Sequence, residues 1–149
     1  MRLGYRAAYR VLQVWALATR PSTRGVKCLL RDEGGRALFV RHTYGDRRKW
    51  QLPGGGTHAA EAPADAARRE AWEELGADVL VWRELGTAVG YWYGKDERLT
   101  VCEAPWPGGP VRRDPVEIAV AEWFPLDAPP SPLAPASLAA LEVVRSGGA

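Results

Sequence analysis

Apolar residues recur along the chain with two different spacings, and each spacing predicts a type of secondary structure. Early in the chain, apolar side chains fall at every second position, at Val26, Cys28 and Leu30, which is the period of a strand. The turn-forming run 32–35 (DEGG) follows, and a second apolar run covers residues 37–40. These residues predict a β-hairpin.

A central helix is predicted over residues 63–75, where Ala and Glu dominate. Pro63 suits the first turn because its missing N–H would be unpaired there, and Gly76 suits the left-handed conformation that ends many helices. The glycine-rich run 52–56 before the helix is predicted to be a loop.

The rest of the pattern predicts further strands and two terminal helices. A partly amphipathic helix is expected over residues 3–18, ended by Pro21, and a last helix over residues 135–144. The further strands are expected at 79–82, 85–92, 99–104 and 119–124. Strands that outnumber helices without regular alternation predict an α+β sandwich, organised as an N-terminal helical extension (1–24) and one domain (25–149).

Composition sets limits on partners and location. A chain of 149 residues with 26% charged residues suits one globular domain. A net charge of +2 suits a small anionic ligand and makes nucleic acid an unlikely main partner. Cys28 and Cys102 stand far apart, which predicts neither a zinc site nor a disulfide framework and favours the cytoplasm. The apolar run 11–18 after three arginines imitates a secretion signal, but it is too short to span a bilayer.

The predicted central helix concentrates carboxylates on one face. Glu70, Glu73 and Glu74 stand at i, i+3 and i+4, where side chains are neighbours and like charges repel. A hard divalent cation such as Mg²⁺ makes such a cluster favourable. The alternative for the three residues taken alone is a solvated acidic face.

The residues around the cluster favour the metal-site interpretation. Arg69 precedes the cluster directly, and Glu61 is placed to hold its guanidinium by a bidentate pair, which would orient the metal ligands. Gly54, Gly55 and Gly56 let the backbone approach an ion or a phosphate, although a plain turn explains a glycine run equally well.

The stretch from Gly55 to Ala77 matches the pattern G-x5-E-x7-R-E-U-x-E-E-x-G-U, with U apolar, at every fixed position. This is the Nudix box, and the chain resembles the Nudix hydrolases. The preceding run 50–53 (WQLP) and the strand order extend the likeness from about Gly25 to Phe124.

The resemblance implies an α/β/α sandwich with a mixed sheet and a central loop-helix-loop that holds Mg²⁺ or Mn²⁺. The ligands that it implies are glutamates of the helix together with a backbone carbonyl, at Gly54, Glu70, Glu73 and Glu74. Arg69 and Glu61 would be the supporting pair. A further acidic ligand or base is expected at Glu117, before the strand that contains Trp123, with Glu97, Glu103 and Glu122 as competitors.

The activity implied is hydrolysis of a phosphoanhydride bond in a nucleoside diphosphate linked to another moiety, such as a nucleotide, a sugar nucleotide or a dinucleotide. Water would attack phosphorus while metal ions neutralise the phosphate oxygens. Glu73, Glu74 and Glu117 are all candidates for the base. His58, Ala60 and Ala62 depart from residues common in relatives and leave the number of metal ions open.

Residues outside the helix are candidates for substrate contacts. Arg41 and Arg48 could bind a distal phosphate together with Gly55 and Gly56, or belong to a solvated basic loop. The aromatic run 91–93 could stack a base or fill the core of a strand. Trp72 could pack on a neighbouring loop or contact a second subunit, so a homodimer stays open. No motif names the organic group of the substrate.

Two other function classes compete with hydrolysis. A Nudix-fold sensor or interaction module without turnover would usually lose box glutamates, and here all of them are present. An isomerase of the same fold acting on an isoprenoid diphosphate would need a reactive cysteine, and Cys28 lies within a predicted strand.

Overall fold

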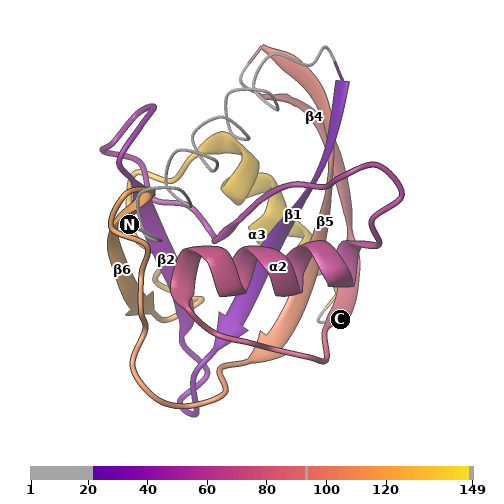
Figure 1. The fold of residues 1–149 in the computed structure, drawn as a ribbon. Helices are drawn as coiled ribbons and strands as arrows, with labels where there is room; N and C mark the ends of the chain where they lie inside the picture. Colours follow the sequence, from indigo (N-terminus) through magenta and orange to yellow (C-terminus); the bar gives the residue numbers. More distant parts are fainter. Residues whose placement is uncertain (1–21, 93, 148–149) are drawn as a thin grey trace.

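The computed structural model describes residues 22–92 and 94–147 (Figure 1). The predicted N-terminal helix over residues 3–18 and the side chain of Tyr93 lie outside this part of the chain.

One mixed sheet organises the domain. Its strands are β1 (Ser22–Arg31), β2 (Ala37–His42), β3 (Gly54–Gly56), β4 (Arg83–Trp92), β5 (Lys95–Pro105) and β6 (Ile118–Phe124). The order across the sheet is β4-β5-β1-β2-β6, and the short β3 pairs with β1. β1 and β5 run parallel, whereas the other neighbours run antiparallel, so the predicted β1–β2 hairpin is confirmed.

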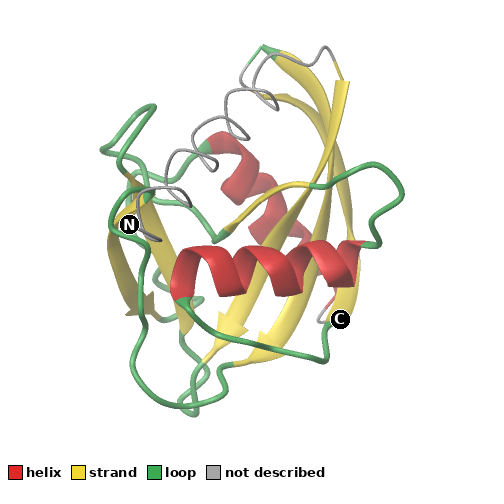
Figure 2. Ribbon diagram, viewed as in Figure 1, coloured by secondary structure: helices red, strands yellow, loops and turns green. Residues whose placement is uncertain are grey.

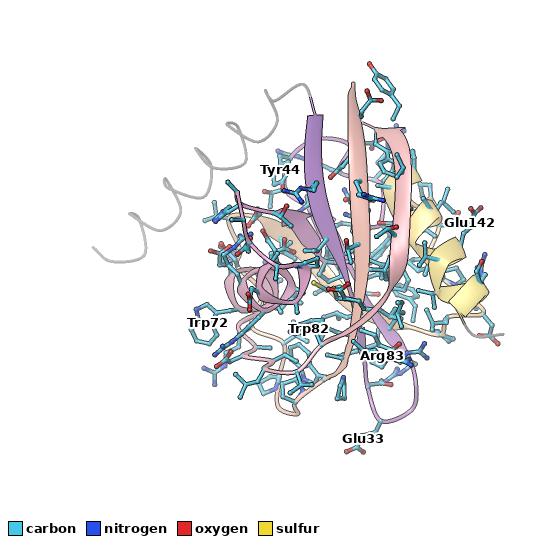
Figure 3. All side chains as sticks on the ribbon, turned by 90° about the vertical axis from the view of Figure 1, so that its right-hand side faces the viewer. Glu33, Tyr44, Trp72, Trp82, Arg83 and Glu142 are labelled. Atoms are coloured by element: carbon cyan, nitrogen blue, oxygen red, sulfur yellow. The ribbon has the colours of Figure 1, made fainter. Side chains whose placement is uncertain are left out.

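Two helices cover the two faces of the sheet. α2 (Pro63–Leu75) crosses in front of β1 in Figure 1, and α3 (Pro135–Gly147) lies behind the sheet. Figure 2 shows the same three layers by type of structure. In Figure 3, Trp72 on α2 and Glu142 on α3 mark opposite sides of the molecule. The predicted sandwich with a mixed sheet is confirmed.

Each face of the sheet has its own apolar core, because side chains alternate along the strands. On the α2 side, Leu30, Leu38 and Val40 pack with Ala71 and Leu75. The α3 side contains the following buried residues: Leu29, Phe39, Leu52, Val101, Ala140 and Leu141. Among the described residues, neither helix is long and apolar enough to cross a bilayer.

The ends of α2 agree with the prediction. Pro63 occupies the first turn, and Gly76 ends the helix with φ 69° and donates its N–H to Trp72 O. The backbone of Arg112 and Asp114 then donates to the carbonyls of Leu75 (3.0 Å) and Glu74 (2.8 Å). The end of α2 is therefore fixed to the segment that leads into β6.

Two predictions of local structure were wrong. Residues 79–82 form no strand; Val79 and Trp82 instead pack against the α2-side core, and β4 begins only at Arg83. Only these two residues of the run contribute to the core, whereas Leu80 and Val81 are exposed. Residues 54–56 were predicted as loop but form β3, because β1 pairs with their backbone at Gly25, Val26 and Lys27.

Gly76 provides a test of how α2 is anchored. In Gly76→Ala, the new Cβ would stand 2.8 Å from Arg112 Cβ and 3.1 Å from Arg112 O, in addition to the strain of a left-handed backbone. We expect a loss of about 2 kcal/mol or more in the free energy of unfolding, measured by urea denaturation.

Gly35→Ala is the matched control, because Gly35 also has a positive φ (82°) but a Cβ there would meet nothing within 4 Å. It should lose only about 1 kcal/mol. Equal losses in the two variants would show that the contact with Arg112 contributes nothing.

Candidate functional site

β3 brings the glycine run of the Nudix-like pattern against α2 at Arg69 and Glu70. Gly55 pairs with Val26 of β1, and a Cβ at Gly55 would stand 2.7 Å from Glu70 Oε1. Only glycine leaves room here for the carboxylate of Glu70 beside the backbone. The structure therefore brings together the glycines and a helix glutamate that the sequence analysis grouped into one site.

Arg69 connects the helix to the residues before it. Its Nε and Nη2 donate to the two oxygens of Glu61 at 3.0 and 2.9 Å, which is the predicted bidentate pair. Nη1 donates to Glu70 at 2.9 Å and to Glu73 at 3.3 Å, and Nη2 also donates to Gly56 O at 2.9 Å. One guanidinium therefore fixes two carboxylates of the cluster against β3.

The electrostatics of this network follow from its hydrogen bonds. The hydrogen bonds from Arg69 hold the pKa of Glu61 below its usual range, against the opposing effect of burial. Burial alone would lower the pKa of Arg69, but its bonds and charge interactions with Glu61 and Glu70 raise it. Both partners therefore stay ionised near neutral pH.

The glutamates of α2 differ in exposure. Glu70 and Glu74 are buried, with 5% and 1% of their surfaces exposed, whereas the side chain of Glu73 is 25% exposed. Carboxylates on a freely solvated helix face would not be buried in this way. Their burial therefore favours the metal-site interpretation and disfavours the alternative of a solvated acidic face.

Lys27 is a buried cation in the same region that the sequence analysis missed. Its Nζ donates to Gln51 Oε1 at 3.3 Å and to Leu52 O at 3.5 Å. Burial lowers the pKa of Lys27, and the negative charges of Glu74 and Glu97 oppose that shift. A charged residue between Val26 and Cys28, both buried, was the signal that could have identified it.

Glu117 lies in the segment between β5 and β6 that is anchored to the end of α2. It is 6% exposed, and Tyr44 Oη donates to its Oε1 at 3.4 Å. Its backbone N–H donates to the carbonyl of Asp114, whose own N–H bonds Glu74 O. The fold therefore connects Glu117 to the helix that carries the other candidate ligands.

The competitors of Glu117 have different surroundings. Glu103 is ion-paired with Arg31 (3.1 Å) and Arg83 (3.0 Å), and Glu122 is exposed on β6. Glu97 lies on β5, with its carboxylate against Gly25.

The two candidate phosphate-binding arginines already have contacts. The guanidinium of Arg41 lies over the ring of Trp50, 4.9 Å from its centroid. Arg48 is exposed and donates to Asp46 at 3.3 Å in the segment between β2 and β3.

The donor atoms of the site fit a hard divalent cation. Carboxylate and carbonyl oxygens are the ligands that Mg²⁺ and Mn²⁺ prefer, and the space above Gly55 lets Glu70 reach the backbone of β3. Across residues 22–92 and 94–147, no group of three acidic, His or Cys side chains stands ready to hold an ion. In this arrangement Arg69 contacts the carboxylates of both Glu70 and Glu73.

Comparisons with known proteins agree with this geometry. The model of the NUDIX domain family matches residues 21–145. The MutT NUDIX hydrolase from Burkholderia pseudomallei superposes with a TM-score of 0.74 at 28% identity, covering 84% of this chain and 99% of that one.

Curated proteins match over shorter stretches, and two of them illustrate this. An RNA pyrophosphohydrolase of Bartonella henselae is 36% identical over 87 residues, which is 54% of this chain and 49% of that protein. The low-salt glycan biosynthesis protein Agl8 of Haloferax volcanii is 42% identical over 62 residues, which is 42% of this chain and 40% of that protein. The chain thus spans less than half of the length of these curated relatives.

The family match extends over most of the chain, and the fold and the arrangement of the box residues agree with it. The chain therefore belongs to the Nudix hydrolase family.

Proposed function

We propose that this protein is a metal-dependent pyrophosphohydrolase that cleaves a phosphoanhydride bond in a nucleoside diphosphate linked to another moiety. The observation that supports it most is the Arg69 network, which fixes Glu61, Glu70 and Glu73 against the glycines of β3. The names of the Burkholderia and Bartonella relatives, a Nudix hydrolase and an RNA pyrophosphohydrolase, point to the same class of reaction.

Mg²⁺, with Mn²⁺ as the alternative, would be held by Glu70, Glu73, Glu74 and Glu117, together with the carbonyl of Gly54. A bound cation supplies neutralisation of phosphate charge and lowers the pKa of a water molecule.

The side chains of the protein supply orientation and a proton acceptor. Arg69 and Glu61 keep the helix carboxylates in place, since the guanidinium contacts Glu61 and two box glutamates at once. Glu73, Glu74 and Glu117 are the candidates for accepting the proton of the attacking water. Glu73 is the most exposed of the three and Glu74 the most buried.

Substrate phosphates would contact the open backbone of Gly55 and Gly56 and the guanidinium groups of Arg41 and Arg48. Arg48 is exposed and would exchange its bond to Asp46 for a phosphate contact. A cytoplasmic location and a homodimer stay predictions; for the latter, Trp72 is 51% exposed on the outer side of α2.

The isomerase alternative is weakened by the surroundings of Cys28. Burial raises the pKa of its thiol well above the usual value, and the nearby charges of Glu74 and Glu70 add to the shift. The thiol is therefore held in its unreactive, protonated form. The remaining alternative is a ligand sensor without turnover, which the following experiment separates from an enzyme.

The proposed activity is tested with purified protein, Mg²⁺ and a panel of nucleoside triphosphates, dinucleoside polyphosphates, nucleotide sugars, ADP-ribose, NADH and a 5′-triphosphorylated RNA. We expect turnover of at least one class, with products identified by chromatography. Glu73→Gln and Glu74→Gln should each lower that turnover by about 10²-fold or more, because each removes a ligand or base. If the protein binds the metal but hydrolyses no member of the panel, the ligand sensor is favoured. Near-normal rates of hydrolysis in both variants would refute the metal site.

Arg69 can be tested with its neighbour as the control. Arg69→Lys keeps the charge but loses the planar fork that contacts Glu61 and two other carboxylates, so kcat should fall about tenfold or more. Arg68→Lys should change kcat less than about twofold, because Arg68 pairs with Asp78 at the exposed surface. Equal rates in the two variants would contradict the positioning role of Arg69.

Glu117 is tested against Glu122 on the neighbouring strand. Glu117→Gln should lower kcat about tenfold or more if this carboxylate is a ligand or base. Glu122→Gln is the control, since Glu122 is exposed, and its kcat should not change. A lower kcat in Glu122→Gln together with an unchanged kcat in Glu117→Gln would assign the role of ligand or base to Glu122 and not to Glu117.

A further inference from the structure

One face of the sheet next to the glycine strand carries an aromatic ring and a carboxylate that the proposed hydrolysis does not use. Ala88 of β4 pairs with Leu99 of β5, and Leu99 pairs with Gly25 of β1. Gly90 pairs with Glu97 in the same register. Paired residues share a face, and side chains alternate along a strand, so these residues lie on the α3 side of the sheet, as Val101 does. We use the name small-residue face for the surface formed by Gly25, Ala88, Gly90, Glu97 and Leu99 together with Trp92.

The two large side chains of this face lie directly on glycines. A Cβ at Gly90 would stand 2.5 Å from Trp92 Cζ2, so the indole ring covers Gly90. A Cβ at Gly25 would stand 2.7 Å from Glu97 Oε1, so the carboxylate covers Gly25. Glycine at both positions is what lets the ring and the carboxylate lie against the backbone.

The small-residue face is continuous with the candidate catalytic site. The point above Gly25 that lies 2.7 Å from Glu97 Oε1 also lies 3.1 Å from the carbonyl oxygen of Gly55. Gly55 belongs to β3, which contacts Glu70 of the box. A ligand whose phosphates contact β3 can therefore extend over Gly25 toward Glu97, and Trp92 covers Gly90, which pairs with Glu97 on the neighbouring strand.

We propose that the small-residue face binds the nucleobase of the substrate, with Trp92 stacking on the base and Glu97 selecting guanine. This inference rests on the proposed function and deepens it. An ionised carboxylate only accepts hydrogen bonds and can accept two side by side. Guanine presents two adjacent N–H donors on its pairing edge, whereas adenine, cytosine and uracil place an acceptor beside each donor. Stacking on an aromatic ring adds affinity for any base.

A purely structural role for Glu97 makes a different prediction. The carboxylate also attracts the buried ammonium of Lys27, which lies on the same face of β1. A carboxylate that only balances Lys27 would affect the stability of the fold, but it would not distinguish one base from another.

The test is calorimetric titration of the full chain with GMP, AMP, CMP and UMP, which needs no turnover. GMP should bind at least about tenfold more tightly than the others, because charged hydrogen bonds discriminate by this order. Glu97→Gln should reduce the affinity for GMP to that for AMP. Trp92→Leu should weaken all four nucleotides by about tenfold.

Glu103→Gln is the matched control, because Glu103 lies on the same strand and face but next to Arg31 and Arg83 and away from Gly25. It should keep the preference for GMP, and thermal unfolding checks that each variant is folded. Equal affinities for all bases in the unchanged protein, or a preference for GMP that survives in Glu97→Gln, would overturn the inference. So would unchanged affinities in Trp92→Leu.

The two proposals fail in different ways. Preferential binding of GMP without hydrolysis of any substrate in the panel would refute the enzyme and keep the guanine site. Hydrolysis that is lost in Glu74→Gln but shows no preference for guanine would keep the enzyme and refute the guanine site.

Discussion

The geometry of the candidate site depends on the guanidinium of Arg69. Like charges at successive turns of a helix repel each other, and Glu70 is also buried, which adds a desolvation cost. Arg69 offsets both effects by contacting Glu70 and Glu73 while it is itself held by Glu61. Its bond to Gly56 O extends the same network to β3. The helix, the strand and the connection between them are therefore oriented by one side chain, whose planar donors match several oxygens at once.

Lys27 complements this network from the sheet. Its ammonium is bonded to Gln51 and Leu52, directly before the glycine run, and lies in the field of Glu74. The carboxylates of Glu70, Glu73 and Glu74 supply hard oxygen donors, and this is the physical reason why a divalent cation would be attracted here. The site thus combines such donors with the hydrogen bonds of Arg69 and Lys27.

The layered fold separates the two chemical tasks that we assign to this protein. α2 covers one face of the sheet and supplies the carboxylates, whereas Trp92 and Glu97 lie on the other face. β3 connects the two faces because its backbone passes between Glu70 and Glu97. Gly55 of β3 leaves room for Glu70 and Gly25 of β1 leaves room for Glu97, and a larger residue at either position would close that approach. In this arrangement the reaction and the recognition of the organic group are built from different strands and can vary independently.

The sequence by itself determined the family, the bounds of α2 and the pairing of Arg69 with Glu61, because all three depend on residues that are close together along the chain. It also predicted the β1–β2 hairpin from its turn residues. Only the tertiary structure decided that residues 54–56 are a strand, that residues 79–82 are not, and that Lys27 and Glu97 approach the site. β3 and the approach of Lys27 and Glu97 arise where β1 meets β3 and β5, which are far apart in sequence, and spacing along the chain carries no information about such contacts. Strand pairing therefore decided what the local sequence could not.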